Sequence, residues 1–199
     1  MLTSNGVTDW TLVRTVAPSE RPVSLEQAKQ TTRLSQADST HDGTLLRLID
    51  GATSMVEQHT DRVLCTQEFH AFYNAFPSRD EPVILPHKPI ASITTVTYLD
   101  QEGASQTLDP ADYLLDVGQR LLYLPQGKSW PATASQIRAV TVDYVAGYGG
   151  AVNLDPLFKQ AILLLVGVWF NDPAMEFTRP QHSTAYDYII ESLLRTSYP

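Results

Sequence analysis

Apolar residues recur at three- and four-residue steps between Leu45 and Val56, and this spacing places them on one face of a helix. We predict that the helix covers residues 42–60, with Asp42 as the residue that caps its N-terminus. The apolar face should be buried against other elements of the fold.

A shorter helix is predicted upstream, over residues 24–34. Ser24 and Gln27 form a capping box, in which the serine hydroxyl and the glutamine amide oxygen accept hydrogen bonds from backbone N–H groups at the helix start. Residues 1–21 show no sustained period and contain Pro18, so we expect an extended N-terminal arm before this helix.

Between residues 64 and 150 the pattern changes to short β-rich runs that are separated by Pro and Gly. The runs cover residues 66–73, 83–85, 93–99, 113–115, 121–124 and 137–144. One antiparallel sheet is the simplest arrangement for runs that follow one another so closely. The turn-forming residues from Asp100 to Gly103 predict a hairpin between two of the runs.

Helical character returns at Asp155 and Pro156, which suit the cap and the first position of a helix over residues 155–171. Its apolar residues occupy every side, so neighbouring helices or neighbouring subunits must cover it nearly all round. The class predicted is therefore α+β: a small bundle of two N-terminal and two C-terminal helices with an inserted antiparallel β-rich region. The main domain spans residues 22–171.

The last segment, residues 172–199, is predicted to be a linker followed by an amphipathic helix. The apolar stripe of this helix consists of Tyr186, Ile189, Ile190, Leu193 and Leu194. A helix of about a dozen residues is marginal by itself, so the stripe needs a surface to bind. We predict that the stripe, together with Tyr198, forms an interface with another protein or another subunit.

The acidic charge of the chain argues against one class of function. The chain of 199 residues has 14 Lys and Arg against 22 Asp and Glu, and its net charge of -8 argues against a protein that binds nucleic acid through the phosphates.

The single cysteine, Cys65, cannot form an internal disulfide, so we expect a reducing cytosol during assembly. The longest apolar run, residues 161–170, is about half a bilayer span, and no membrane contact is expected.

Motifs that would support catalysis or cofactor binding are incomplete. The sequence Gly127-Lys128-Ser129 lacks the earlier glycine of a phosphate-binding loop, and residues 147–150 lack the third glycine of a dinucleotide fingerprint. The five histidines include no pair at metal-ligand spacing. We therefore nominate no catalytic, cofactor-binding or metal-ligating residue, and we predict that the protein is not an enzyme.

The order of the segments carries more information than any single motif. Six pieces follow one another: PVSLEQAK from Pro22, residues 45–60, LPHKPIASITTVTYLD from Leu85, QGKSWPAT from Gln126, VTVDYVAGYG from Val140 and FKQAILLLVGVWFNDP from Phe158. Together they resemble the head-tail connector proteins, also called adaptor or head completion proteins, of long-tailed bacteriophages and gene transfer particles. The resemblance covers roughly residues 22–171.

The resemblance implies a structural virion protein without catalysis or a cofactor. Such a chain would form a homo-oligomeric ring of about twelve copies. The ring would bind the portal protein at the head vertex and a stopper or tail-completion protein on the tail side. Duplex DNA would pass through without specific binding, because ring and DNA carry charge of the same sign. The protein would assemble in the host cytoplasm and lie at the head–tail interface of the virion.

Two candidate contacts follow from this resemblance. The stripe of the last helix would bind the portal or an adjacent subunit. Asp100 and Glu102 of the hairpin would face a neighbouring subunit, the tail-side partner or the channel wall. The main alternative is a β-rich tail or baseplate module that binds a carbohydrate or a partner, and a hydrolase built from distant residues is a third alternative.

Overall fold

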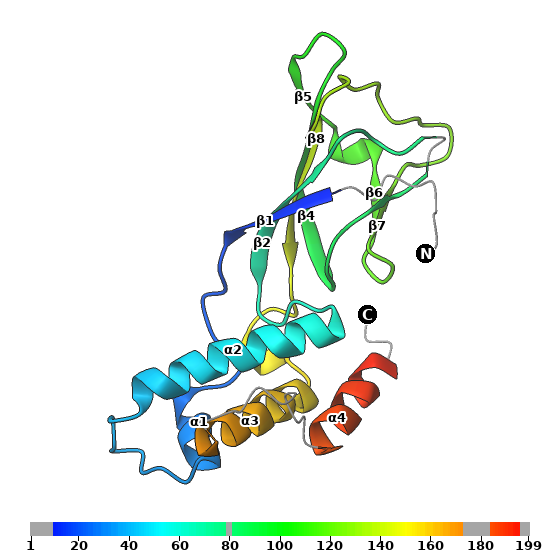
Figure 1. Cartoon of the computed structure of the whole chain (residues 1–199). Coiled ribbons are helices and arrows are strands. Elements are labelled where there is room, and N and C mark those ends of the chain that lie inside the picture. Colours follow the sequence, from blue (N-terminus) through cyan, green and yellow to red (C-terminus); the bar gives the residue numbers. More distant parts are fainter. Residues whose placement is uncertain (1–9, 79–80, 173–183, 196–199) are drawn as a thin grey trace. The chain divides into compact units, whose positions relative to one another are not determined.

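The computed structural model describes residues 10–78, 81–172 and 184–195. These residues fall into two compact units, one with the helices and one with the strands (Figure 1). The helical unit contains residues 18–65 and the described residues after 147, and the β unit contains residues 10–17 and 66–147. The α+β class predicted from the sequence is confirmed.

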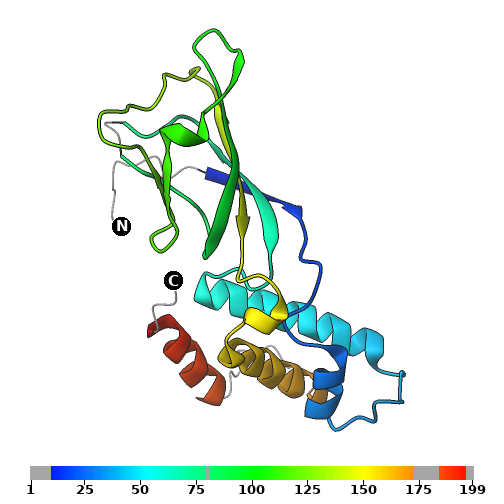
Figure 2. The ribbon, with the colours of Figure 1, turned by 180° about the vertical axis from the view of Figure 1, so that it is seen from behind.

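Four α-helices lie in the described part of the helical unit. They are α1 at Leu25–Thr31, α2 at Asp42–Thr60, α3 at Pro156–Asn171 and α4 at Thr184–Arg195, and a 3-10 turn covers Ala151–Asn153. α3 contacts the other three helices, and α2 also contacts α1 and α4 (Figures 1 and 2). The apolar face predicted for α2 is buried, including Leu45, Ile49 and Val56. α3 is covered less completely by the chain itself, because Val168 remains exposed.

The predicted caps of α1 and α3 are confirmed. The Ser24 hydroxyl accepts a hydrogen bond of 3.2 Å from the backbone N–H of Gln27, and the Gln27 side chain accepts one of 2.9 Å from the N–H of Ser24. At α3, the Asp155 carboxylate accepts a hydrogen bond of 2.7 Å from the N–H of Leu157, with Pro156 at the first turn. Both helices therefore begin where their local sequence satisfies the free N–H groups.

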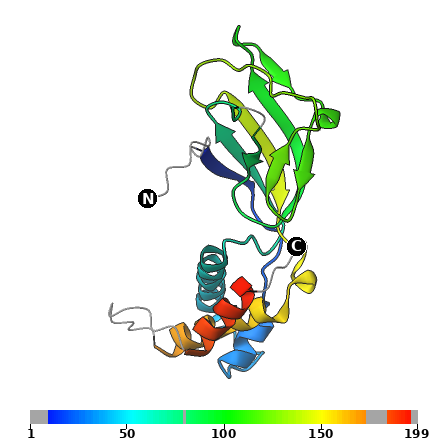
Figure 3. The ribbon, with the colours of Figure 1, turned by 90° about the vertical axis from the view of Figure 1, so that its right-hand side faces the viewer.

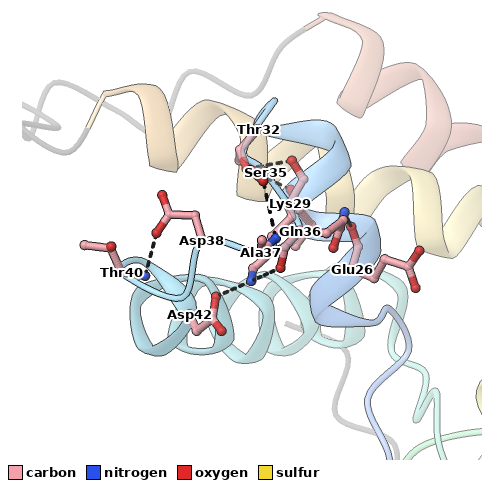
Figure 4. A network of polar contacts seen from close by, with 10 residues as sticks. Glu26, Lys29, Thr32, Ser35, Gln36, Ala37, Asp38, Thr40 and Asp42 are labelled. Atoms are coloured by element: carbon pink, nitrogen blue, oxygen red, sulfur yellow. Dashed lines mark hydrogen bonds and ion pairs between the residues drawn. The ribbon is translucent and has the colours of Figure 1, made fainter.

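Asp42 has a different role from the predicted one. His41 occupies the N-cap position of α2, without a side-chain cap, and Asp42 is the first helical residue. The Asp42 carboxylate lies 2.7 Å from Nζ of Lys29, whose side chain is buried beneath the loop between α1 and α2 (Figure 4). Nζ of Lys29 also donates to the carbonyl of Gln36 at 3.2 Å. The Asp42 carboxylate therefore pairs with the Lys29 ammonium instead of capping the helix, because a buried charge without a partner is costly.

The β unit contains two antiparallel sheets (Figure 3). The larger sheet has the order β1-β2-β8-β4-β5, with β1 at Trp10–Val16, β2 at Gln67–Tyr73, β8 at Val140–Ala146, β4 at Ile90–Leu99 and β5 at Ser105–Thr107. The smaller sheet has the order β3-β7-β6, with β3 at Val83–Ile84, β7 at Leu121–Tyr123 and β6 at Leu114–Asp116. A 3-10 turn at Pro110–Asp112 precedes β6.

The division of the strands differs from the sequence prediction. The predicted runs belong to two sheets instead of one. Residues 10–16, part of the predicted arm, are extended but form β1, which pairs with β2. The local pattern could not show this pairing, because the partner strand lies far along the chain. β5 has no counterpart among the predicted runs, since three residues are too few to show an alternation.

The two sheets share one core. Alternate residues of β2 and β8 are buried, among them Val142 and Tyr144. The Tyr73 hydroxyl of β2 donates to the carbonyl of Ile84 on β3 at 2.7 Å and so connects the two sheets. The Tyr144 hydroxyl of β8 donates to the carbonyl of Pro86, which follows β3, at 2.7 Å. Burial raises the pKa of Tyr73 far above its ordinary value.

Candidate assembly surfaces

Three residues of the predicted apolar stripe of α4, Tyr186, Ile190 and Leu193, belong to the core of the helical unit. Tyr186 and Leu193 are 1% and 0% exposed, and Ile190 is also buried. The Tyr186 hydroxyl shares a hydrogen bond of 2.9 Å with Nδ1 of His59 on α2. Burial raises the pKa of Tyr186 to about 12. The chain itself therefore covers these three side chains before any partner binds.

A partner could contact the side chains of α4 that remain exposed. Leu194 is 55% exposed and Ile189 is half-buried, whereas Tyr198 lies outside the described residues. Tyr188, which is not part of the predicted stripe, is 75% exposed. A protein that binds α4 would meet Leu194 and Tyr188, and the assignment of this helix to an interface remains a prediction.

The hairpin predicted at residues 100–103 is confirmed, and it connects β4 with β5. The Asp100 carboxylate accepts hydrogen bonds from the Gln106 side-chain amide and from the N–H of Ala104, both at 2.8 Å. These bonds hold the pKa of Asp100 below its ordinary value. Glu102 is exposed in the turn. Asp100 thus stabilises the turn, Glu102 is presented to solvent, and an interface role for either residue remains a prediction.

The smaller sheet has an apolar face that is open to solvent, and the sequence analysis missed it. Directly paired residues project from the same side of a sheet, and the register pairs Ile84 with Leu121 and Leu114 with Tyr123. We call this side, together with the turn after β6, the open sheet face. Asp116, which pairs with Leu121, also lies on this side. The apolar residues of the face are Ile84, Leu114, Val117, Leu121 and Tyr123. All of these except the half-buried Leu121 are 38% to 49% exposed.

A second apolar surface lies at the edge of the larger sheet. No strand in the described ranges pairs with the outer side of β1, and all residues of β1 except Leu12 are exposed. Val13 and Val16 project from the same side of β1, because they pair with His70 and Glu68, whereas Trp10 projects from the other side. We call the side with Val13 and Val16 the β1 surface; these two residues are 43% and 47% exposed. Such an edge strand is a template on which another chain can pair or pack.

The motifs that were weighed for other chemistry have ordinary structural roles. Gly127 has a φ of 84°, as in a turn, and Nζ of Lys128 pairs with the Asp112 carboxylate at 2.5 Å. Positive φ angles at Gly147 and Gly149 make the predicted bend after β8. Across the described residues, no three His, Cys, Asp or Glu side chains gather as a metal site would require. No helix in these ranges is both long and apolar enough to cross a bilayer.

Comparison with known proteins gives matches in structure. No family model matches the sequence, and no curated protein matches it. A chain of the virion of a native gene transfer agent particle has the same fold, with a TM-score of 0.76 and 20% identity, over 92% of this chain and 94% of that one.

Two further matches come from the neck of the same kind of particle. A chain in the neck of the empty particle, computed with C6 symmetry, matches with a TM-score of 0.76 at 20% identity. A chain in the neck of the native particle, computed with C12 symmetry, matches with a TM-score of 0.69 at 19% identity. Both matches cover 92% of this chain and 94% of the other chain. At this identity, the likeness shows a shared fold.

Proposed function

We propose that the chain is a structural subunit of the neck of a phage-like or gene-transfer particle, where it forms the adaptor ring between the portal and the stopper or tail. The observation that carries this proposal is the fold shared with neck chains over nearly the whole length of both proteins. The ordered sequence segments that resemble head-tail connectors support the same assignment independently.

A ring of twelve copies is the stoichiometry that fits best. The native gene transfer agent neck that contains the similar chain was computed with C12 symmetry. Exposed apolar residues on both units, including Tyr123 of the β unit and Val168 of the helical unit, provide area that other chains would cover. The portal protein and a stopper or tail-completion protein are the partners on the two sides of the ring.

The acidic charge suits a passage for DNA. Each copy carries a net charge of -8, so a ring presents a strongly negative surface to a duplex that is itself negative. DNA would then move through the ring without binding to it. The work of the protein is mechanical and needs neither a catalytic residue nor a cofactor.

Deletion of the gene, with complementation in trans, tests this function. We expect DNA-filled heads and free tails to accumulate, because the joint between them is missing, and we expect the wild-type gene to restore complete particles. Electron microscopy and density-gradient sedimentation measure both species. Complete particles that fail to adsorb to cells would instead favour a tail or baseplate module, and complete infectious particles would refute a role in the neck.

A further inference from the structure

We propose that neighbouring copies in the ring contact each other through their β units, with the β1 surface of one copy packed on the open sheet face of the next. This inference rests on the proposed ring and adds the identity of the surfaces that close it. The occupant of each surface is thus a second copy of this chain.

The first argument is symmetry. A ring with cyclic symmetry is built from heterologous contacts, so each copy must carry two different surfaces that fit each other. The β unit carries two such surfaces, one on each of its sheets. Among the described residues, they hold six of the twelve large apolar side chains that are exposed. The apolar area available for contacts is therefore concentrated on these two surfaces.

The second argument is chemical fit. Ile84, Leu114 and Tyr123 form an apolar patch with Asp116 at its β6 edge, and exposed apolar patches rimmed by polar residues mark sites where proteins bind. Besides its apolar side chains, β1 offers a backbone edge on which no strand of the described ranges pairs.

Contact with a second copy would cover both surfaces of every subunit, whereas a portal or tail protein would cover only one of them. DNA is a poor occupant, because apolar side chains offer no charge to its phosphates. Contact between copies leaves the helical unit and the acidic hairpin for the portal and tail partners.

The test is cysteine cross-linking in assembled particles. The native Cys65 is buried, and its pKa is raised to about 11, so it should not react with maleimides at neutral pH. The full-length chain with both Val13→Cys and Tyr123→Cys is assembled into particles and treated with a flexible bismaleimide. We expect a ladder of covalent multimers that extends beyond the dimer, because every heterologous contact holds one cysteine of each kind.

The control variants decide between arrangements. Each single-cysteine variant should remain monomeric, since a heterologous contact never brings two identical positions together. A variant with Val13→Cys and Val152→Cys, which places the second cysteine on an exposed residue of the helical unit, should give no ladder. Dimers from a single-cysteine variant, or no ladder from particles that contain the Val13→Cys and Tyr123→Cys chain, would overturn the inference and leave the function in the neck standing.

A second measurement does not depend on cross-linking. Leu114→Lys places a charge in the open sheet face and should reduce incorporation into particles about tenfold or more. Ile137→Lys, at a residue of the same unit that is 79% exposed and outside both surfaces, should leave incorporation unchanged. Equal incorporation of both variants would contradict the proposed contact. Absence of the wild-type chain from particles would instead overturn the proposed function, and the inference with it.

Discussion

The position of α4 in the chain's own core leads to a sharp stability prediction for two adjacent leucines. Leu193 is 0% exposed and lies in the core formed with α2 and α3, whereas Leu194 is 55% exposed. Replacing each with alanine removes the same atoms from two different environments. If α4 is folded onto the subunit before assembly, Leu193→Ala destabilises the isolated protein strongly and Leu194→Ala hardly affects it.

The expected size of the difference follows from burial. Removing the buried carbons of a leucine costs about 2 kcal/mol in transfer free energy, and the cavity left behind brings the usual total to about 2–5 kcal/mol. α4 is a short helix of 12 residues that can partly settle into the cavity, so we expect a loss of about 3 kcal/mol for Leu193→Ala. The exposed Leu194 should contribute less than about 0.5 kcal/mol.

Urea unfolding of the purified chain, followed by far-UV circular dichroism, measures the free energy of unfolding for both variants. Amide hydrogen exchange of peptides from α2 and α3 reports on the helical unit separately from the β unit. Equal unfolding midpoints for the two variants would show that α4 is not packed on the isolated subunit and becomes ordered only on a partner.

Three further predictions concern individual groups. Ser24→Ala removes the capping box of α1 and should lower the free energy of unfolding by about 1 kcal/mol in the same urea assay, and an unchanged midpoint would contradict this. Cys65 should resist iodoacetamide in the native protein and react after unfolding, as followed by mass spectrometry; rapid native alkylation would show that its burial is wrong. The pKa of Tyr186 is raised from 10.0 to about 12 in the folded state, so the unfolded state loses its proton first as the pH rises. The contribution of Tyr186 to stability should therefore be lost between about pH 10 and pH 12, so stability should fall less steeply over this range in Tyr186→Phe, and identical pH profiles would refute the assignment.

The elements that follow from the sequence are those whose signals are local. The helices α1 and α3 begin at side-chain caps within a few residues of the predicted starts. The apolar period of α2 fixes its buried face, and Asp100 and Gly103 fix the hairpin turn. Each signal depends on neighbours in the chain, so it can be recognised without knowledge of the tertiary structure.

The remaining features depend on contacts between distant segments. The local sequence makes Asp42 a candidate cap, and only the tertiary structure shows that its carboxylate pairs with the buried Lys29. The stripe of α4 needs a surface to bind, but its sequence cannot show whether the chain or a partner supplies that surface. In the smaller sheet, the strands have two or three residues each, and their register alone shows that Ile84 and Tyr123 project outward. The open sheet face could therefore be recognised only after the strands were paired.

Cryo-electron microscopy of complete particles that carry this chain, with classification focused on the junction of head and tail, tests the central claim most directly. We predict a closed ring of twelve copies between the portal and the tail, around a central channel, with each β unit touching the next. Density for the chain at the tail tip or baseplate, or single copies without ring contacts at the junction, would contradict it.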